Sequence, residues 1–115
     1  GSPGAEVIAQ AMTQAFLNVN VFAMDPQAAV EAPRFASYSW PASTLPHTCK
    51  PARLSLEGAI GRDVGDALAG LGHDIEWWPH RKWSAGSVCT IIKDLDTGVM
   101  HTGADPRRSA YAIGW

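Results

Sequence analysis

Apolar residues recur at helical spacing near the start of the chain, over residues 3–18. Glutamate and glutamine occupy the intervening positions, a pattern typical of an amphipathic helix. The apolar members of this stripe are Val7, Ile8, Ala11, Met12, Ala15, Phe16 and Val19. We expect the stripe, Met12 and Phe16 included, to lie in the hydrophobic core rather than to bind a cofactor.

Two shorter helices are predicted further along the chain. Asp25 and Pro26 form a typical pair of N-cap and first-turn residues, so a helix is predicted over residues 27–32. A second apolar helical face covers residues 63–71. Gly72 follows it, at the position where a left-handed residue often ends a helix.

Alternating or continuous apolar runs predict strands between and after these helices. The predicted strands are residues 35–40, 53–57, 75–78, 87–92 and 99–103. Residues 41–51, which contain three prolines, form a loop, and a polar Asp-Thr-Gly turn at residues 96–98 joins the last two strands. The sum is an α+β fold, in which helices flank mostly antiparallel strands.

Length and composition limit the possible functions. The 115 residues are 46% hydrophobic and 17% charged, which suits one globular domain, and no repeat or linker divides residues 1–115. A net charge of −2 gives no reason to expect nucleic acid or an anionic membrane surface as a partner. No apolar run has the length of a membrane span and no signal-peptide pattern is present, so the cellular compartment stays open.

Few side chains suggest metal or nucleophile chemistry. Cys49 and Cys89 could form one disulfide or be buried as small apolar residues, and we favour burial. The histidines and cysteines lack a paired ligand spacing, so neither a metal nor another cofactor is expected. No serine has a nucleophile-elbow context, and an amine-activated nucleophile would have to be residue 1, which is glycine.

The first five residues hold the strongest candidate chemistry. Ser2 suits a helix N-cap and Pro3 the first helical position, which would make Gly4 and Ala5 the next two helical residues. Backbone N–H groups there lack intrahelical partners and lie at the positive end of the helix dipole. They could bind an anion or a developing oxyanion. The alternative is an ordinary helix start, in which the Ser2 hydroxyl caps these same donors.

Two further groups of residues have both a functional and a structural interpretation. Residues 77–83 combine three tryptophans with a histidine, an arginine and a lysine. They could form a partner surface, but we favour a loop packed on a neighbouring part of the same protein. Arg34 is interpreted as one half of an ion pair, and Asp105, Arg107 and Arg108 as a charge-paired turn.

Four phrases of the sequence together resemble one family. They are GSPG at residues 1–4, MDPQAAVEAPRF at residues 24–35, LGH at residues 71–73 and GADPRR at residues 103–108. In this order they resemble the C-terminal part of the small subunit of γ-glutamyltransferases (γ-glutamyltranspeptidases), members of the N-terminal-nucleophile hydrolase superfamily. The resemblance covers nearly the whole chain, and DPQAAVEAPRF is its most specific part.

The resemblance implies a share of a four-layer αββα sandwich, and a parent precursor that cuts itself into a large and a small subunit. The cleavage would free an N-terminal threonine, outside this chain, which attacks a γ-glutamyl amide before water or an amine takes the acyl group. The family's oxyanion hole consists of two consecutive glycine N–H groups, which fall on Gly4 and Ala5. This chain would then be inactive alone, with the rest of the small subunit and the large subunit as partners.

Two departures from the family pattern bear on the substrate. Ala5 replaces the second glycine, so its N–H is kept while its methyl group narrows the approach. Residues 77–83 are longer and more aromatic than is typical of the family. Both departures favour an amidase or acylase over an enzyme restricted to glutathione. Two alternatives stay open: a stand-alone α+β binding module that uses the tryptophan-rich loop, and an inactive homologue kept for assembly.

Overall fold

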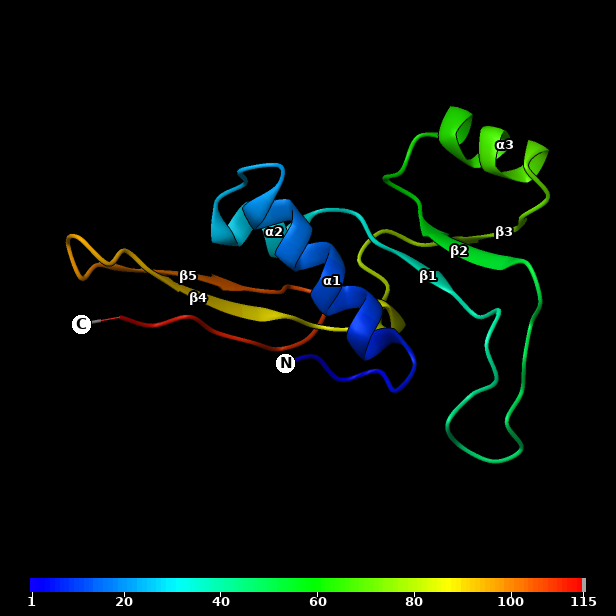
Figure 1. Cartoon of the computed structure of the whole chain (residues 1–115), viewed down its shortest axis with the longest axis horizontal. Coiled ribbons are helices and arrows are strands. Elements are labelled where there is room, and N and C mark those ends of the chain that lie inside the picture. The colour runs from blue at the N-terminus through cyan, green and yellow to red at the C-terminus, as the bar shows by residue number, and fades with distance from the viewer. Residues whose placement is uncertain (115) are drawn as a thin grey trace.

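A computed structural model describes residues 1–114 of the chain and shows an elongated molecule (Figure 1). Its Cα radius of gyration is 15.5 Å, whereas a compact domain of this length has about 13 Å. The helices are α1 (Val7–Asn20), α2 (Pro26–Glu31), α3 (Arg62–Gly70) and the 3₁₀ helix η1 (Trp83–Ala85). The strands are β1 (Phe35–Ser37), β2 (Arg53–Glu57), β3 (Asp74–Trp78), β4 (Cys89–Lys93) and β5 (Met100–Ala104).

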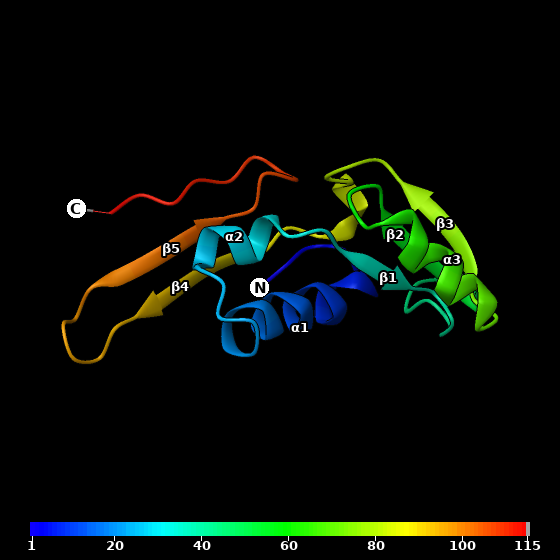
Figure 2. The same ribbon diagram turned by 90° about the horizontal axis from the view of Figure 1, so that it is seen from above.

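The strands form two sheets at opposite ends of the molecule, with α1 and α2 between them (Figure 2). The first sheet has the order β1-β2-β3, in which β1 runs antiparallel to β2, and Phe35 lies opposite Leu56. The pair β2 and β3 is parallel, with Leu54 opposite Ile75, and α3 supplies the crossover that parallel strands require. The second sheet is the antiparallel hairpin of β4 and β5. Helices with mainly antiparallel strands confirm the α+β class.

Helix α1 begins later than the sequence predicted. It starts at Val7, with Glu6 as an N-cap that makes no side-chain capping bond. Gly4 has φ +129° and Ala5 has φ +49°, conformations that a right-handed helix cannot include. The prediction that Ser2 caps the helix and that Gly4 and Ala5 form its first turn is therefore wrong.

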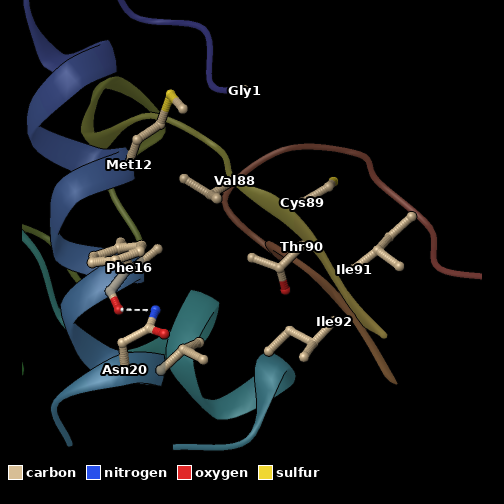
Figure 3. A pocket seen from close by; sticks show the side chains of 11 residues that line it. Gly1, Met12, Phe16, Asn20, Val88, Cys89, Thr90, Ile91 and Ile92 are labelled. Atoms are coloured by element: carbon tan, nitrogen blue, oxygen red, sulfur yellow. Dashed lines mark hydrogen bonds between the residues drawn. The ribbon is translucent and has the colours of Figure 1, made fainter. Parts of the chain in front are cut away.

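Only part of the apolar stripe of α1 is buried. Val7, Ala11 and Ala15 lie in the core, whereas Met12 and Phe16 are 43% and 63% exposed. Met12 and Phe16 face the hairpin across an open groove (Figure 3). The expectation that they are core residues is therefore wrong, because the described residues cover only one edge of the stripe.

Helix α2 lies directly against the hairpin. The Asp25 carboxylate accepts a hydrogen bond from the backbone N–H of Gln27 at 3.0 Å, which confirms the predicted N-cap. The Gln27 side-chain amide then donates to the carbonyl of Ala104 and accepts from its N–H, both at 3.0 Å. Gly103 permits this approach, since a Cβ there would overlap the backbone carbonyl of Pro26.

The hydrophobic core is small and rich in alanine. Its members are Val7, Ala11, Ala15, Val30, Ala36, Trp78, Ala85 and Val88. Larger apolar side chains stay exposed on the hairpin, where Ile91 is 71% and Met100 65% exposed. Cys49 and Cys89 are also exposed, and neither is in a disulfide within residues 1–114, so the expectation that they are buried is wrong.

Candidate functional site

The candidate site is the turn of residues 1–5 that precedes α1. The carbonyl oxygens of Gly4 and Ala5 accept hydrogen bonds from the N–H groups of Val7 and Ile8, each at 3.0 Å. The N–H groups of Gly4 and Ala5 themselves donate no hydrogen bond to any residue from 1 to 114. Gly4 is half-buried and Ala5 is exposed. Two adjacent backbone donors are thus available, in a positive-φ turn rather than in a helix start.

Ser2 does not cap these donors. Its hydroxyl donates to the carbonyl of Pro3 at 3.0 Å and accepts from the backbone N–H of Ser87 at 3.0 Å. The alternative of an ordinary capped helix start is therefore contradicted. Ser2 instead connects the turn to the loop of residues 82–88.

Buried charged side chains fix that loop. Glu57 accepts a hydrogen bond from the N–H of Lys82 at 2.8 Å, Arg34 donates to the carbonyl of Ala85 at 3.3 Å, and Asp105 accepts from the N–H of Val88 at 3.0 Å. These contacts hold the loop at its beginning, its middle and its end. The turn of residues 1–5 therefore rests on a loop that is itself attached to the protein interior.

The charged side chains belong to one ion-pair network, whose members are all at most 3% exposed. Arg107 contacts both carboxylate oxygens of Glu57, at 2.5 and 2.8 Å, and one oxygen of Asp105 at 3.1 Å. Arg34 lies 2.7 Å from the other oxygen of Asp105. The structural interpretation of Arg34, Asp105 and Arg107 is confirmed. Glu57 was missed, because a glutamate ending an alternating strand gives no sequence signal of burial.

The network has a definite charge state. Burial raises the pKa of Glu57, but hydrogen bonds from Arg107 and from the N–H groups of Arg34 and Lys82 outweigh it, so that the pKa lies below its ordinary value. Burial and repulsion by Arg107 lower the pKa of Arg34, whereas the pKa of Arg107, despite its burial, is raised by Glu57 and Asp105. Because arginines stay protonated across the usual pH range, two cations balance two anions.

The tryptophans of residues 77–83 do not form one surface. Each packs against a side chain of this same chain: Trp77 under Arg62 at 4.0 Å, Trp78 edge-on against Tyr38 at 6.3 Å, and Trp83 under Arg108 at 3.6 Å. Trp78 is buried, which agrees with the favoured interpretation, while Trp83 is 63% exposed. Arg108 therefore stacks on an aromatic ring and forms no ion pair with any residue from 1 to 114, contrary to the expected charge-paired turn.

A groove of about 310 Å³ opens between α1 and β4 (Figure 3). Met12 and Phe16 form its helix wall, and Thr90 and Ile92 of β4, together with Val88 just before the strand, point into it from the other side. Within residues 1–114 no three histidine, cysteine or acidic residues gather as a metal site would require. No helix in this part of the chain is long and apolar enough to cross a membrane.

Comparison with known proteins gives a match over the full chain. The family model described as gamma-glutamyltranspeptidase matches residues 1–115. The glutathione hydrolase proenzyme of Bacillus subtilis (strain 168) is 30% identical over 114 residues. That alignment covers 99% of this chain but only 17% of the proenzyme, so the chain corresponds to a small part of its relative.

Solved structures give the same picture. A cephalosporin acylase from Bacillus halodurans has a TM-score of 0.83 and 26% identity, with 100% of this chain and 19% of that chain covered. A mutant gamma-glutamyltranspeptidase from Helicobacter pylori has a TM-score of 0.70 and 28% identity, with 94% of this chain and 52% of that chain covered.

Proposed function

The chain belongs to the γ-glutamyltranspeptidase family, and from this premise we propose that it is the C-terminal part of the small subunit of a γ-glutamyltransferase-like amide hydrolase or acyltransferase. In this proposal the N–H groups of Gly4 and Ala5 form the oxyanion hole. The supporting observation is that these two consecutive donors, which match the family's oxyanion phrase, have no partner within residues 1–114. The nucleophile is an N-terminal threonine on another segment of the same precursor.

The proposed role is electrostatic. When the nucleophile attacks the substrate carbonyl, the electron pair of the C=O bond moves to oxygen, and the two N–H groups donate to the oxyanion. This first tetrahedral intermediate collapses to an acyl-enzyme as the amine leaves with a proton. Water or an amine acceptor then attacks the carbonyl of the acyl-enzyme, which forms a second tetrahedral intermediate. The same two N–H groups donate to the oxyanion in both intermediates. In other hydrolases, removing one such donor costs about 3–4 kcal/mol of transition-state stabilisation.

The exposed apolar surface supports the proposed partners, which are the remainder of the small subunit and the large subunit. Helix α1 carries the exposed Phe16 on its side toward the hairpin, and the hairpin carries the exposed Ile91 and Met100. Side chains of this size are usually covered when they gather on one part of a surface. The alanine-rich core and the large radius of gyration fit a piece of a larger globule, which would be inactive by itself.

The proposed substrate is a small-molecule amide or γ-glutamyl compound. The relatives named above are a glutathione hydrolase and a cephalosporin acylase, which supports a small acyl-carrying substrate. The methyl group of Ala5 stands beside one of the two donors and reduces the space there relative to glycine. We therefore favour an amidase or acylase over an enzyme restricted to glutathione.

Backbone esters test the oxyanion role directly. Replacing Gly4 by glycolate or Ala5 by lactate in the complete protein deletes one N–H and leaves the side chain unchanged. With γ-glutamyl-p-nitroanilide or glutaryl-p-nitroanilide, we expect kcat to fall by about 10²–10³ and KM to change little, since the donors act on charge that develops in the transition state. Lactate at Ala69 in α3, at the far end of the molecule, is the control and should leave kcat unchanged.

Two results would contradict the proposal. If the esters at residues 4 and 5 retain the parent kcat, these N–H groups are not the oxyanion donors. If the complete protein turns over neither anilide nor any other small amide, the alternative of an inactive homologue kept for assembly replaces the enzyme.

A further inference from the structure

We propose that Ser2 and Gly86 are positioning residues, which together hold the Gly4–Ala5 turn in place against the loop of residues 82–88. This inference rests on the proposed oxyanion role and names the side chains on which it depends. Neither residue touches the reacting atoms. Both act through the backbone of the turn.

Ser2 provides the attachment. Among residues 1–114, the bond from the Ser87 N–H to the Ser2 hydroxyl is the only hydrogen bond that joins residues 1–5 to any segment beyond α1. The hydroxyl also donates to the Pro3 carbonyl, so one oxygen is hydrogen-bonded both within residues 1–5 and to the loop of residues 82–88. Without it, the turn would keep only its two bonds to the first residues of α1.

Gly86 provides the room for this attachment. Its φ is +84°, a conformation that favours glycine, and a Cβ at this position would lie 2.6 Å from the Ser2 hydroxyl oxygen. The same Cβ would lie 3.1 Å from Cβ of Ala11 and 3.4 Å from the carbonyl oxygen of Pro3. Any side chain at residue 86 must therefore displace the Ser2 hydroxyl, which breaks the hydrogen bond that attaches the turn to the Ser87 N–H.

The turn also lies close to the loop. A Cβ built on Gly4 would lie 3.8 Å from Cα of Gly86 and 4.0 Å from the carbonyl oxygen of Ser84, so the space between the two backbones would hold only about one methyl group. A shift of the loop at residue 86 therefore reaches the candidate donors over a short distance, through the Ser2–Ser87 hydrogen bond.

The loop is a firm support because buried charges hold it on both sides of Ser87. Asp105 accepts from the N–H of Val88, and Arg34 donates to the carbonyl of Ala85. Ser87 itself is buried, with 8% of its surface exposed, so leaving its N–H without the Ser2 partner is costly. The buried ion-pair network thereby determines where the Gly4–Ala5 turn lies, through the loop and Ser2.

The experiment compares two glycines that both have a positive φ but different surroundings. Gly98 has φ +74° and no atom within 4 Å of a built Cβ, so Gly98→Ala adds a methyl group at a positive-φ glycine without the collision. The ψ of −177° at Gly86 adds backbone strain of its own, which Ser2→Ala does not share. Four variants are made in the complete protein: Gly86→Ala, Gly98→Ala, Ser2→Ala and the double variant Ser2→Ala/Gly86→Ala. The measurements are kcat and KM for γ-glutamyl-p-nitroanilide or glutaryl-p-nitroanilide, and hydrogen exchange at the Ser87 amide.

We expect Gly86→Ala to lower kcat by about 10- to 100-fold with KM little changed, because displacing a catalytic group by about 1 Å has an effect of this order. Gly98→Ala should retain the parent kcat. Ser2→Ala and Gly86→Ala both remove the Ser2–Ser87 bond, so the double variant should lose less than the product of the two single losses. Exchange at the Ser87 amide should accelerate in every variant except Gly98→Ala.

The positioning role is overturned if Gly86→Ala and Gly98→Ala lower kcat alike, if the two single losses multiply in the double variant, or if exchange at Ser87 stays slow in Gly86→Ala. Failure of the oxyanion role itself has a different signature. In that case the backbone esters at residues 4 and 5 retain full kcat, whatever the Gly86 variants do.

Discussion

Arg107 is the side chain whose removal should destabilise this chain most. Its guanidinium group is fully buried and donates five hydrogen bonds. Two go to Glu57, at 2.5 and 2.8 Å, and one to Asp105 at 3.1 Å. The other two go to the backbone carbonyls of Val30 at 2.9 Å and Ala32 at 2.8 Å. One side chain thereby joins α2, β2 and the turn after β5.

Replacing Arg107 by methionine keeps most of the apolar stem and removes the charge. The Glu57 carboxylate, whose side chain is 0% exposed, then has no cationic side chain bonded to it, while Asp105 still has Arg34. Removing one partner of a buried ion pair costs about 3–5 kcal/mol, because the remaining charge stays desolvated. The unpaired carbonyls of Val30 and Ala32 add to this cost. A total protein stability of about 5–15 kcal/mol would be substantially reduced.

The assay is urea unfolding of the complete protein, followed by tryptophan fluorescence. The control is Arg81→Met, which removes an ion pair of 2.7 Å between Arg81 and Glu31 whose side chains are 41% and 37% exposed. Solvent screening limits that loss to under about 1 kcal/mol. If Arg107→Met and Arg81→Met shift the unfolding midpoint equally, burial does not make the Arg107 contacts costly to lose, and the reasoning is wrong.

Two further outcomes are expected. Because the pKa of Glu57 lies below its ordinary value of 4.5, its carboxylate contributes stability that is complete above pH 4.5 and is lost as the pH falls below it. Below pH 4.5, the free energy of unfolding should therefore fall less steeply with decreasing pH for Glu57→Gln than for the parent. Equal slopes of the two proteins would contradict this. Gly103→Ala should destabilise the protein by about 1–3 kcal/mol, since its Cβ would overlap the Pro26 carbonyl. The control is Gly70→Ala in α3, where a built Cβ has no atom within 4 Å, and it should be neutral or stabilising by up to about 1 kcal/mol. Thermal unfolding measures both variants. Equal effects of the two alanines would refute the close contact of β5 with α2.

Most of the secondary structure could be predicted from the sequence because its signals are local. The Asp25-Pro26 pair starts α2 through a carboxylate that binds N–H groups two and three residues away. The alternation over residues 53–57 matches the bounds of β2, although residues 54–57 are buried on both faces of that strand. The turn at residues 96–98 likewise lies between β4 and β5.

Features that depend on distant parts of the chain could not be predicted. The positive φ angles of Gly4 and Ala5 belong to a turn that Ser2 attaches to Ser87, more than eighty residues away, and no local pattern encodes this contact. Helical periodicity showed that Met12 and Phe16 share an apolar face, but not what covers it. The choice of Gly4 and Ala5 as candidate donors survives the change from helix to turn, and their catalytic role remains a prediction.

The β4–β5 hairpin has a consequence for handling the protein. Within residues 1–114 its two strands pair only with each other, so each has an outer edge of backbone groups with no strand beside it. Such edges recruit further strands and promote aggregation, the more so beside exposed apolar residues such as Ile91. The 115 residues expressed in isolation should consequently precipitate by edge-to-edge association. In the complete polypeptide, strands from the rest of the protein would pair with these same edges, so that strand addition becomes part of folding.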